Sequence, residues 1–337
     1  MATREHTATR EHTADPTKIH HEWDLDLEPV LTIDSGDIVH FDIQVAGEGQ
    51  VWPGARFEEA KFDFDSIYNL CGPVNVAGAT AGDMLEIEIL DLQAGDWAWA
   101  AFLPGMGLLP EDFPEAYVKT FDLTRGPNIN FAPGIEVPIT PFLGTMGTHP
   151  GTPGRQVPFP PHRGGGNMDN RHLTAGATLW LPVWVDGGMF SCGDPHAAQG
   201  DGEVCVTAIE CPMKASLKFT LHQSKVTVPS FHVPPAAVSK KDEMGYYATM
   251  GIDSDLMNGA KTATRAMIDW LVDTHGLTRE DAYVLCSATG DLRIIEIVDA
   301  GVWNVAMTMP LGVFTDTKST FRREPSPSAP IPKLSGS

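Results

Sequence analysis

The segment of residues 190–203 has the side chains best suited to chemistry. It reads Phe-Ser-Cys-Gly-Asp-Pro-His-Ala-Ala-Gln-Gly-Asp-Gly-Glu, with three carboxylates, one imidazole and one carboxamide but neither Lys nor Arg. A carboxylate removed from water needs a cation, a set of hydrogen-bond donors or a proton. We therefore expect this segment to be solvated, or to hold a metal ion or a substrate.

Two pairs within this segment have the spacing needed to converge. Asp194 and His196 are two residues apart, and so are Asp201 and Glu203. In an extended chain residues i and i+2 point to the same face. A mixed oxygen and nitrogen donor set suits Zn²⁺, Mn²⁺ or Fe²⁺, whereas carboxylates alone favour Ca²⁺ or Mg²⁺. The alternative is a turn-rich hairpin loop whose acids are solvated.

A glycine-rich segment could supply a second group of polar atoms. Gly164, Gly165 and Gly166 precede Asn167 and Asp169. Glycines let backbone N–H groups approach a ligand, so this segment could bind an anion or an oxyanion. The alternative is an ordinary glycine-rich loop.

Two adjacent histidines, His20 and His21, precede Trp23 near the start of the chain. Adjacent side chains of a strand point to opposite faces, so at most one of the two imidazoles reaches a common site. The alternative is a group of surface polar residues before a strand.

Cys192 lies beside the acids and could be a thiolate nucleophile near His196. Neighbouring carboxylates raise the pKa of a thiol and so disfavour the thiolate. The sequence therefore argues against a nucleophilic role for Cys192.

The composition limits the partners of the chain. The 44 acidic against 23 basic residues give a formal charge of −21, which argues against nucleic-acid binding because that needs a basic face.

The sequence has no apolar run of about 18 residues, so no membrane span is expected. The five cysteines are odd in number and have no C-x-x-C spacing, and the first residues lack the apolar core of a secretory signal. These features predict a cytoplasmic protein with free thiols.

The sequence predicts a mainly β fold, sandwich-like or barrel-like, with a smaller α/β portion at the C-terminal end. Alternating patterns predict strands at 38–45 and 84–90, the latter with Glu86 and Glu88 on one solvated face. Further strands are expected at 178–185, 203–211, 216–222, 294–298 and 302–307, whereas 95–170 has little periodicity.

A helix is predicted after residue 258, where apolar residues recur at helical spacing up to a stop at Gly276. Thr278 and Asp281 then resemble a capping box that opens a second helix toward Cys286. We expect a disordered tail over 1–18, a β-rich catalytic region over 19–225, an α/β portion over 226–322 and a second disordered tail over 323–337.

Over about residues 20–315 the sequence resembles the acetamidase/formamidase family, and its length is similar to the shorter, acetamidase-like branch. The segments that carry the resemblance are, in chain order, 20–24, 35–37, Asn69 with 72–74, Gly78 with Gly82 and Asp83, 104–109, 141–147, the Gly-Asn-Met-Asp sequence within 165–169, 181–183, 190–203, 281–283 and 298–299.

The resemblance implies hydrolysis of a short, neutral aliphatic amide to its carboxylic acid and ammonia by a homo-oligomeric, mostly β protein. Amide hydrolysis needs a nucleophile, a stabiliser for the oxyanion and an acid for the departing nitrogen. A divalent metal, Zn²⁺ with Ca²⁺, Mn²⁺ or Fe²⁺ as alternatives, would activate water, and no organic cofactor is expected. We expect Asp194, His196 and Asp169 as metal ligands, with His21 as a further candidate.

The remaining predicted roles concern proton transfer and the substrate. Glu203 would be the general base and then the acid, and Asp201 a second ligand or a residue that orients His196. We expect Asn167 or Gln199 to donate to the oxyanion or to bind the amide. The substrate site would further include Gly166 and Trp23.

The resemblance has two departures, and two other functions stay open. His149 stands where the family more usually has a small apolar residue, and Cys192 where an aliphatic residue is expected. The open alternatives are a metal-free amidase that uses Cys192 or a carboxylate, and a non-catalytic β module that binds a metal or a small molecule.

Overall fold

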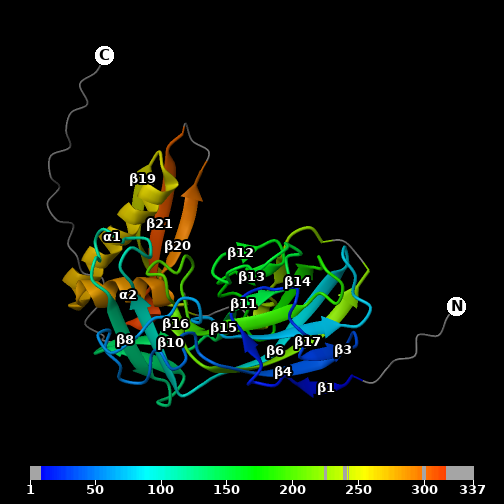
Figure 1. Ribbon diagram of the computed structural model, residues 1–337. Coiled ribbons are helices and arrows are strands. Elements are labelled where there is room, and N and C mark those ends of the chain that lie inside the picture. The colour runs from blue at the N-terminus through cyan, green and yellow to red at the C-terminus, as the bar shows by residue number, and fades with distance from the viewer. Residues whose placement is uncertain (1–8, 224–225, 238–240, 242, 298–300, 316–337) are drawn as a thin grey trace.

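The computed structural model describes residues 9–223, 226–237, 241, 243–297 and 301–315. A large β-rich part lies beside a smaller part in which α1 and α2 accompany β19, β20 and β21 (Figure 1). The mainly β prediction with a smaller α/β portion is confirmed. No helix of the described residues has the length and hydropathy needed to cross a membrane.

One sheet of the β-rich part has six strands, and its central strands alternate between core and surface. Leu85, Ile87 and Ile89 are buried, while Glu86 and Glu88 share the outer face as predicted. In spatial order the strands are β1 (Glu11–Thr13), β4 (Ile38–Ile43), β17 (Met213–His222), β6 (Met84–Ala94), β14 (Thr178–Pro182) and β18 (Ser230–His232).

The second sheet has ten strands, and its central strands are buried along their whole length. The main path is β12 (Pro161–His162), β13 (Gly165–Asn167), β11 (Phe142–Gly147), β15 (Phe190–Ala198), β16 (Ile209–Glu210), β7 (Trp97–Phe102) and β8 (Tyr117–Asp122). Beside it, β2 (Ile19–His20) and β3 (Leu31–Ile33) pair with β5 (Leu70–Val76), which pairs with β15; β9 (Asn128–Ala132) and β10 (Ile135–Pro138) form a separate hairpin.

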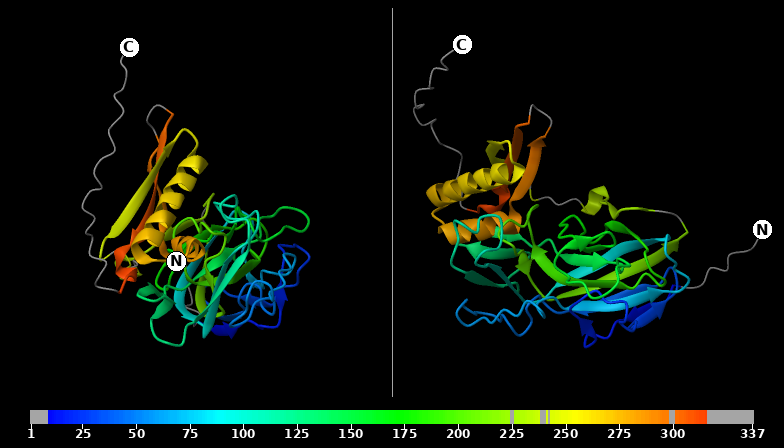
Figure 2. Two further views of the ribbon diagram at one scale, coloured as in Figure 1. Left: turned by 90° about the vertical axis from the view of Figure 1, so that its left-hand side faces the viewer. Right: turned by 45° about the horizontal axis from the view of Figure 1, so that its top comes forward.

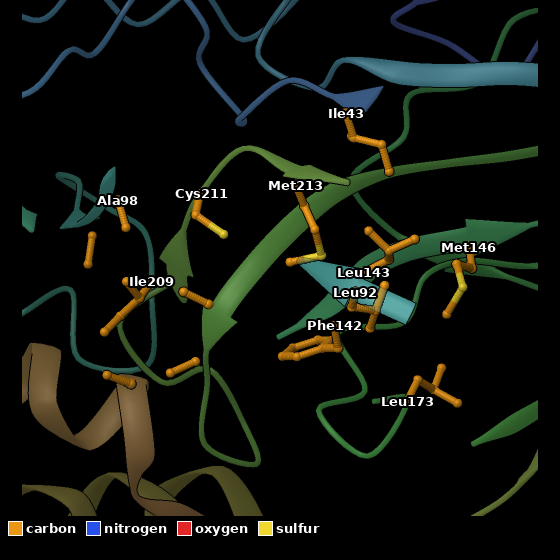
Figure 3. Close-up of a cluster of buried hydrophobic side chains, with 14 of the residues drawn as sticks. Ile43, Leu92, Ala98, Phe142, Leu143, Met146, Leu173, Ile209, Cys211 and Met213 are labelled. Carbon is orange, nitrogen blue, oxygen red and sulfur yellow. The ribbon is translucent and has the colours of Figure 1, made fainter. Parts of the chain in front are cut away.

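The two sheets pack face to face, and their apolar side chains form one core. Phe190 of β15 lies with its ring centroid 6.5 Å from Phe41 of β4 and 5.0 Å from Phe219 of β17. Figure 3 shows Ile43 and Met213 of the six-stranded sheet on one side of this core, with residues of β11 opposite. Truncating a buried phenylalanine costs about 3–5 kcal/mol, so these contacts hold β15 firmly in place.

The C-terminal part is a three-stranded sheet with two helices. Its strand order is β19 (Tyr246–Asp253), β21 (Trp303–Pro310) and β20 (Asp291–Glu296), and α1 (Leu256–His275) lies along this sheet (Figure 2). Short 3₁₀ turns occur at η1 (Pro235–Ala237) and η2 (Leu311–Val313). α1 ends at Gly276 in the left-handed conformation, and Thr278 caps α2 (Arg279–Thr289) by accepting from the Asp281 N–H at 3.0 Å. Both predicted helices are confirmed.

Three sequence predictions differ from the structure. Residues 95–170, which have little periodicity, nevertheless contain β7–β13. β7 and β11 are buried on both faces and so lack alternation, while β9, β10, β12 and β13 are at most five residues long. The strand expected at 203–211 is limited to Ile209 and Glu210, since Glu203 and Val206 have left-handed φ angles of 43° and 84°, which interrupt the extended backbone of a regular strand.

The third difference is at the N-terminal end. Glu11–Thr13 forms β1 and pairs with β4, and His12 Nε2 lies 2.9 Å from Asp37 Oδ2, so a strand stands within the predicted tail. Residues 1–8 and 316–337, which include the second predicted tail, lie outside the described residues, as does Val298 of the strand predicted at 294–298. The boundary at 225/226 stays a prediction.

Candidate active site and metal centre

β15 presents Asp194 and His196 at the centre of the ten-stranded sheet. Asp194 is 4% exposed and His196 is fully buried. Asp194 has a left-handed φ of 52° within the strand, and the register with β16 shifts between His196 and Ala198. A left-handed φ is uncommon for a residue other than glycine, and such strain is concentrated at functional sites. The irregular backbone turns these two side chains toward one point.

Asp169 reaches the same point from the other side of β11. It follows β13, which pairs with β11, and β11 pairs with β15. The backbone N–H of Asp169 donates to the Gly144 carbonyl at 3.2 Å. β11 thus brings together two acids that are 25 positions apart in the sequence.

The segment after β15 adds two further acids. Glu203 lies in a turn with a φ of 43°, and Val206 N–H donates to its carbonyl at 3.0 Å. Glu210 is on β16, directly opposite His196, and its Oε1 accepts from the Ala208 N–H at 3.0 Å. Glu210 is 4% exposed. The cluster therefore has four carboxylates around one imidazole.

Two overlapping groups among the described residues have the geometry of metal ligands. One is Asp194, His196 and Glu210, and the other is Asp169, His196 and Glu203; within each group the ligand atoms lie within 4.8 Å of one another. His196 Nε2 is 3.3 Å from Asp194 Oδ2 and 3.2 Å from Glu210 Oε2. His196 is common to both groups and stands at the centre of the cluster.

Gln199 determines which nitrogen of His196 is available. Its Nε2 donates to the Asp169 carbonyl at 2.7 Å, so its Oε1 faces His196 Nδ1 at 2.9 Å. A carboxamide oxygen only accepts, hence Nδ1 is protonated. In the neutral imidazole Nε2 then has a free lone pair, directed at the carboxylates.

Asn167 holds the Asp169 carboxylate. Its Oδ1 accepts from the Thr145 hydroxyl at 2.6 Å, which orients the amide, and its Nδ2 donates to Asp169 Oδ2 at 2.9 Å and to the Phe159 carbonyl at 3.1 Å. Asn167 and Gln199 thus support the cluster from behind, as outer-shell partners of metal ligands do.

The donor atoms fit a divalent ion. His196 Nε2, Glu210 Oε2 and Asp169 Oδ1 are buried and have no hydrogen-bond partner among the described residues. Two atoms that each lie about 2.0–2.1 Å from a tetrahedrally coordinated ion are about 3.3 Å apart, close to the separations observed around His196. Gly144 leaves the space open, because a Cβ there would lie 2.7 Å from Asp169 Oδ1 and 2.8 Å from Asp194 Oδ2.

Burial and mutual repulsion shift the pKa of Asp169, Asp194 and Glu203 upward. Desolvation, followed by the charge of Asp194, raises the pKa of Asp169 to about 6, and desolvation with the charge of Glu210 raises the pKa of Asp194 to about 6. The pKa of Glu203 is well above its ordinary value, from desolvation and the nearby Asp169. Desolvation lowers the pKa of His196, but Glu210 and Asp194 outweigh it and raise that pKa. The carboxylates thus favour a cation at this point, either the protonated imidazole of His196 or a bound metal ion.

A small cavity with mostly apolar walls ends at this cluster. Its volume is ≈ 60 Å³. A single water needs about 10–15 Å³ of such volume, so the cavity suits a molecule of a few non-hydrogen atoms. Desolvation and the nearby Asp194 charge raise the pKa of Tyr68 well above its ordinary value, so its hydroxyl is protonated. The lining residues are Ala46, Phe64, Ile67, Tyr68, Trp99, Leu103, Met106, Phe159, Asp194, Glu203, Val206, Thr207 and Glu210.

The structure brings some predicted site residues together and places others elsewhere. Asp169, Asp194, His196 and Glu203 form the cluster, and Asn167 and Gln199 contact it. Asp201 instead points away, with its Oδ1 3.1 Å from Arg171 Nε and 3.4 Å from His172 Nε2. The two-residue spacing predicted a shared face, but Glu203 lies in a turn rather than a strand.

The remaining predicted residues lie outside both ligand groups. His21 uses Nδ1 to contact the Tyr68 carbonyl at 2.7 Å. Trp23 is buried against His162, with ring centroids 4.8 Å apart. Gly166 pairs with Met146, and a Cβ on it would lie 2.8 Å from the His162 ring. His149 Nδ1 accepts from the Gly151 N–H at 3.0 Å.

Sequence reasoning missed Glu210, Tyr68 and Gly144. For Glu210 a signal was present, because a single acid stands in the apolar stretch Ala-Ile-Glu-Cys. We find no sequence signal for Tyr68 or Gly144, since Gly144 reaches the site through the pairing of β11 with β15 and Tyr68 through the loop before β5.

Cys192 has no access to the cluster. It is fully buried, it lies opposite Cys71 on β5, and burial together with Cys71 raises its pKa well above the ordinary value. A thiol in this environment stays protonated. All five cysteines are free and buried.

By its fold and its site, this protein belongs to the class of β sandwiches in which the central strands hold a cluster of carboxylates and one imidazole. Within that class, the sequence profile of the Acetamidase/Formamidase family matches residues 6–156 and 152–316. The chain therefore belongs to this family.

Individual relatives agree with this assignment but are distant. A formamidase from Methylophilus methylotrophus is 25% identical over 242 residues, which cover 56% of this chain and 60% of the relative. An acetamidase from Mycolicibacterium smegmatis is 25% identical over 247 residues, 55% of this chain and 61% of the relative. The matched region thus spans about three-fifths of these relatives.

Solved structures match over most of the chain. An acetamidase from Bacillus halodurans has a TM-score of 0.63 at 28% identity, covering 90% of this chain and 98% of that structure. A gamma lactamase from Delftia acidovorans has a TM-score of 0.82 at 23% identity, covering 90% and 93%. The second likeness establishes the fold alone.

Proposed function

We propose that this protein hydrolyses short aliphatic amides to a carboxylate and ammonia at the cluster around His196. The observation that carries the proposal is the convergence of His196 Nε2 with Asp194 and Glu210, without a hydrogen-bond partner for Nε2 among the described residues. Asp194, His196 and Glu210 would hold a divalent ion, with Asp169 beside them. The mixed donor set suits Zn²⁺, Mn²⁺ or Fe²⁺.

Such an ion, when bound, supplies a Lewis acid that lowers the pKa of water and polarises a carbonyl. The chain's own residues provide the rest. Glu203 lines the cavity, where its carboxylate can accept a proton from the attacking water. Burial and the nearby Asp169 raise its pKa, which helps it to hold that proton and then to transfer it to the departing nitrogen.

The hydroxyl of Tyr68 is the donor best placed for the substrate oxygen. It lines the cavity and is protonated, whereas both carboxamides named above are already bonded to the cluster. A single oxyanion donor typically contributes about 10²–10³-fold to the rate. We therefore assign Tyr68 the role first considered for Asn167 or Gln199.

The cavity favours a small, neutral substrate. Its volume of ≈ 60 Å³ accommodates an amide of three to five non-hydrogen atoms, since a single water needs about 10–15 Å³. Its acidic end, which contains Asp194, Glu203 and Glu210, disfavours an anionic substrate. Formamide, acetamide and propionamide are the first candidates.

The test combines elemental analysis of the purified protein with an ammonia-release assay on these three amides. We expect bound divalent metal, loss of activity after dialysis against a strong chelator, and recovery when the metal is returned. Full activity without metal would contradict the metal-dependent mechanism. Saturable metal binding with no ammonia release would instead indicate the non-catalytic β module. Full activity of Glu203→Gln with metal bound would remove Glu203 from proton transfer.

Assembly and location are part of the same proposal. Met250 and Ile252 on β19 are 60% and 65% exposed, which suits burial in a homo-oligomer; analytical ultracentrifugation tests this. Five free, buried thiols suit the reducing cytoplasm.

A further inference from the structure

The segment that carries Glu203 is held by the C-terminal part of the chain. Gly200 N–H donates to the Ser287 carbonyl of α2 at 2.7 Å, and Leu292 N–H of β20 donates to the Asp201 carbonyl at 2.8 Å. A Cβ on Gly200 would lie 1.5 Å from the Gly290 carbonyl oxygen, so only glycine permits this approach. The end of α2 and the start of β20 thus lie directly against the segment.

Asp291, the first residue of β20, is the polar centre of this contact. It is 1% exposed, and its Oδ1 accepts from the Asp201 backbone N–H at 3.0 Å. Glu203 is two residues further along the chain. The Asp291 carboxylate therefore fixes the backbone next to the proposed proton-transfer group.

Three cations hold Asp291 in turn. Its oxygens lie 2.6 Å from Lys241 Nζ, 3.1 Å from Arg171 Nη2 and 3.0 Å from Arg293 Nη2. Although burial alone would raise the pKa of Asp291, Lys241 and Arg171 hold that pKa below its ordinary value. Arg171 Nε also donates to Asp201 Oδ1 at 3.1 Å, so one guanidinium bridges two carboxylates.

The backbone of Glu203 needs such support. Its left-handed φ of 43° costs of order 1–3 kcal/mol for a residue other than glycine and persists only when the surroundings impose it. Within the segment, Glu203 N–H makes a 3.3 Å bond to the Gly200 carbonyl. Gly200 and Asp201 are the positions that the C-terminal part holds, so their placement determines where the Glu203 carboxyl points.

We propose that Asp291 is a positioning residue for amide hydrolysis: it anchors the Gly200–Asp201 backbone so that the Glu203 carboxyl faces Asp169 and the cavity. This inference rests on the proposed role of Glu203. It assigns a catalytic purpose to the C-terminal part, which otherwise contributes no side chain to the cluster among the described residues.

The test compares Asp291→Asn with Asp281→Asn. Asp281 is a matched control, because it also joins the C-terminal part to the β-rich part, through Lys119 Nζ at 2.6 Å, but does not contact the Glu203 segment. For Asp291→Asn we expect kcat to fall about 10–100-fold, KM to change less than about threefold, and metal content to be unchanged. Amide hydrogen exchange over 199–206 should be about tenfold faster. Asp281→Asn should leave kcat and this exchange near the wild-type values.

A second variant covers the case in which Asp291→Asn does not fold. Arg171→Lys keeps the charge but removes the bridge between Asp201 and Asp291, and it should lower kcat and speed exchange over 199–206 to a smaller extent. Unchanged kcat and exchange in the folded variant would overturn the inference, as would equal effects in Asp281→Asn. If Glu203→Gln proves fully active, the proposed function fails. If Glu203→Gln is impaired while Asp291→Asn is not, only the positioning role fails.

Discussion

Two clusters of buried acids in this protein differ in what surrounds them. Asp291 is surrounded by Lys241, Arg171 and Arg293, and its pKa lies below the ordinary value. Among the described residues the charged neighbours of Asp194 are carboxylates and the His196 imidazole, and its pKa is raised to about 6. Both carboxylates are less than 5% exposed. Burial alone therefore does not distinguish the two clusters, whereas a raised carboxyl pKa indicates a candidate site at Asp194.

The sharpest test of the cluster around His196 is Glu210→Gln, which keeps the shape of the side chain and removes its charge. We expect amide hydrolysis to fall about 10³-fold with loss of bound metal, because a ligand to the ion is weakened. Ammonia release and elemental analysis measure both effects.

The matched control is Glu86→Gln on the outer face of β6, where the carboxylate bonds Trp180 and His222 at the surface. Its activity should stay near that of the wild type. Retained metal and activity in Glu210→Gln would show that the cluster does not need a complete set of charges.

The same neutralising change should have opposite effects on stability in the two clusters. In metal-free protein, Asp291→Asn should lower the free energy of unfolding by about 3 kcal/mol, because it removes the buried carboxylate with which Lys241 and Arg171 both pair. Asp194→Asn should raise it by about 1–2 kcal/mol, since it removes a buried acid that repels its neighbours. Urea unfolding in the presence of a chelator measures both values, and each variant is the control for the other. Effects of the same sign would break the comparison.

The space for an ion in the cluster around His196 can be tested separately from the charge of its ligands. Gly144→Ala puts a methyl group within 2.8 Å of Asp194 Oδ2 and His196 Cε1. We expect metal affinity to fall about 10–100-fold while the charges are unchanged. Titration of the metal-free protein measures the affinity. Gly312→Ala, whose Cβ would have its nearest neighbour at 3.4 Å, should bind metal as the wild type does.

The buried imidazole of His20 allows the comparison of buried groups to be tested through the pH dependence of stability. His20 is 8% exposed, bonds Ser191 Oγ at 2.9 Å, and burial lowers its pKa to about 4. Between pH 6.5 and 4 the unfolded chain binds more protons at this residue, so its contribution to stability is lost as the pH falls through that window. We expect this loss to be about 3 kcal/mol smaller in His20→Gln. Equal pH dependence of unfolding in both proteins would contradict the assignment of a buried neutral imidazole.

Local sequence patterns predicted the elements whose structure depends on near neighbours. The capping residue Thr278 and the stop at Gly276 marked the helix ends, and the alternation around Glu86 and Glu88 marked β6. β7 and β11 were missed because strands buried on both faces have no alternation to detect, and β9 and β10 because each has at most five residues.

The sequence by itself determined which residues could do chemistry: an acidic segment without cations, the Gly-Asn-Met-Asp segment and the family to which they belong. Only the tertiary structure decided which of them meet. Glu210 belongs to the cluster because β16 places it opposite His196. Asp201 lies outside the cluster and pairs with Arg171, because the backbone at Glu203 turns. The physical reason is that spacing along a chain specifies direction only within one regular element. Convergence between elements depends on strand register and on strained turns, which packing of the whole fold imposes.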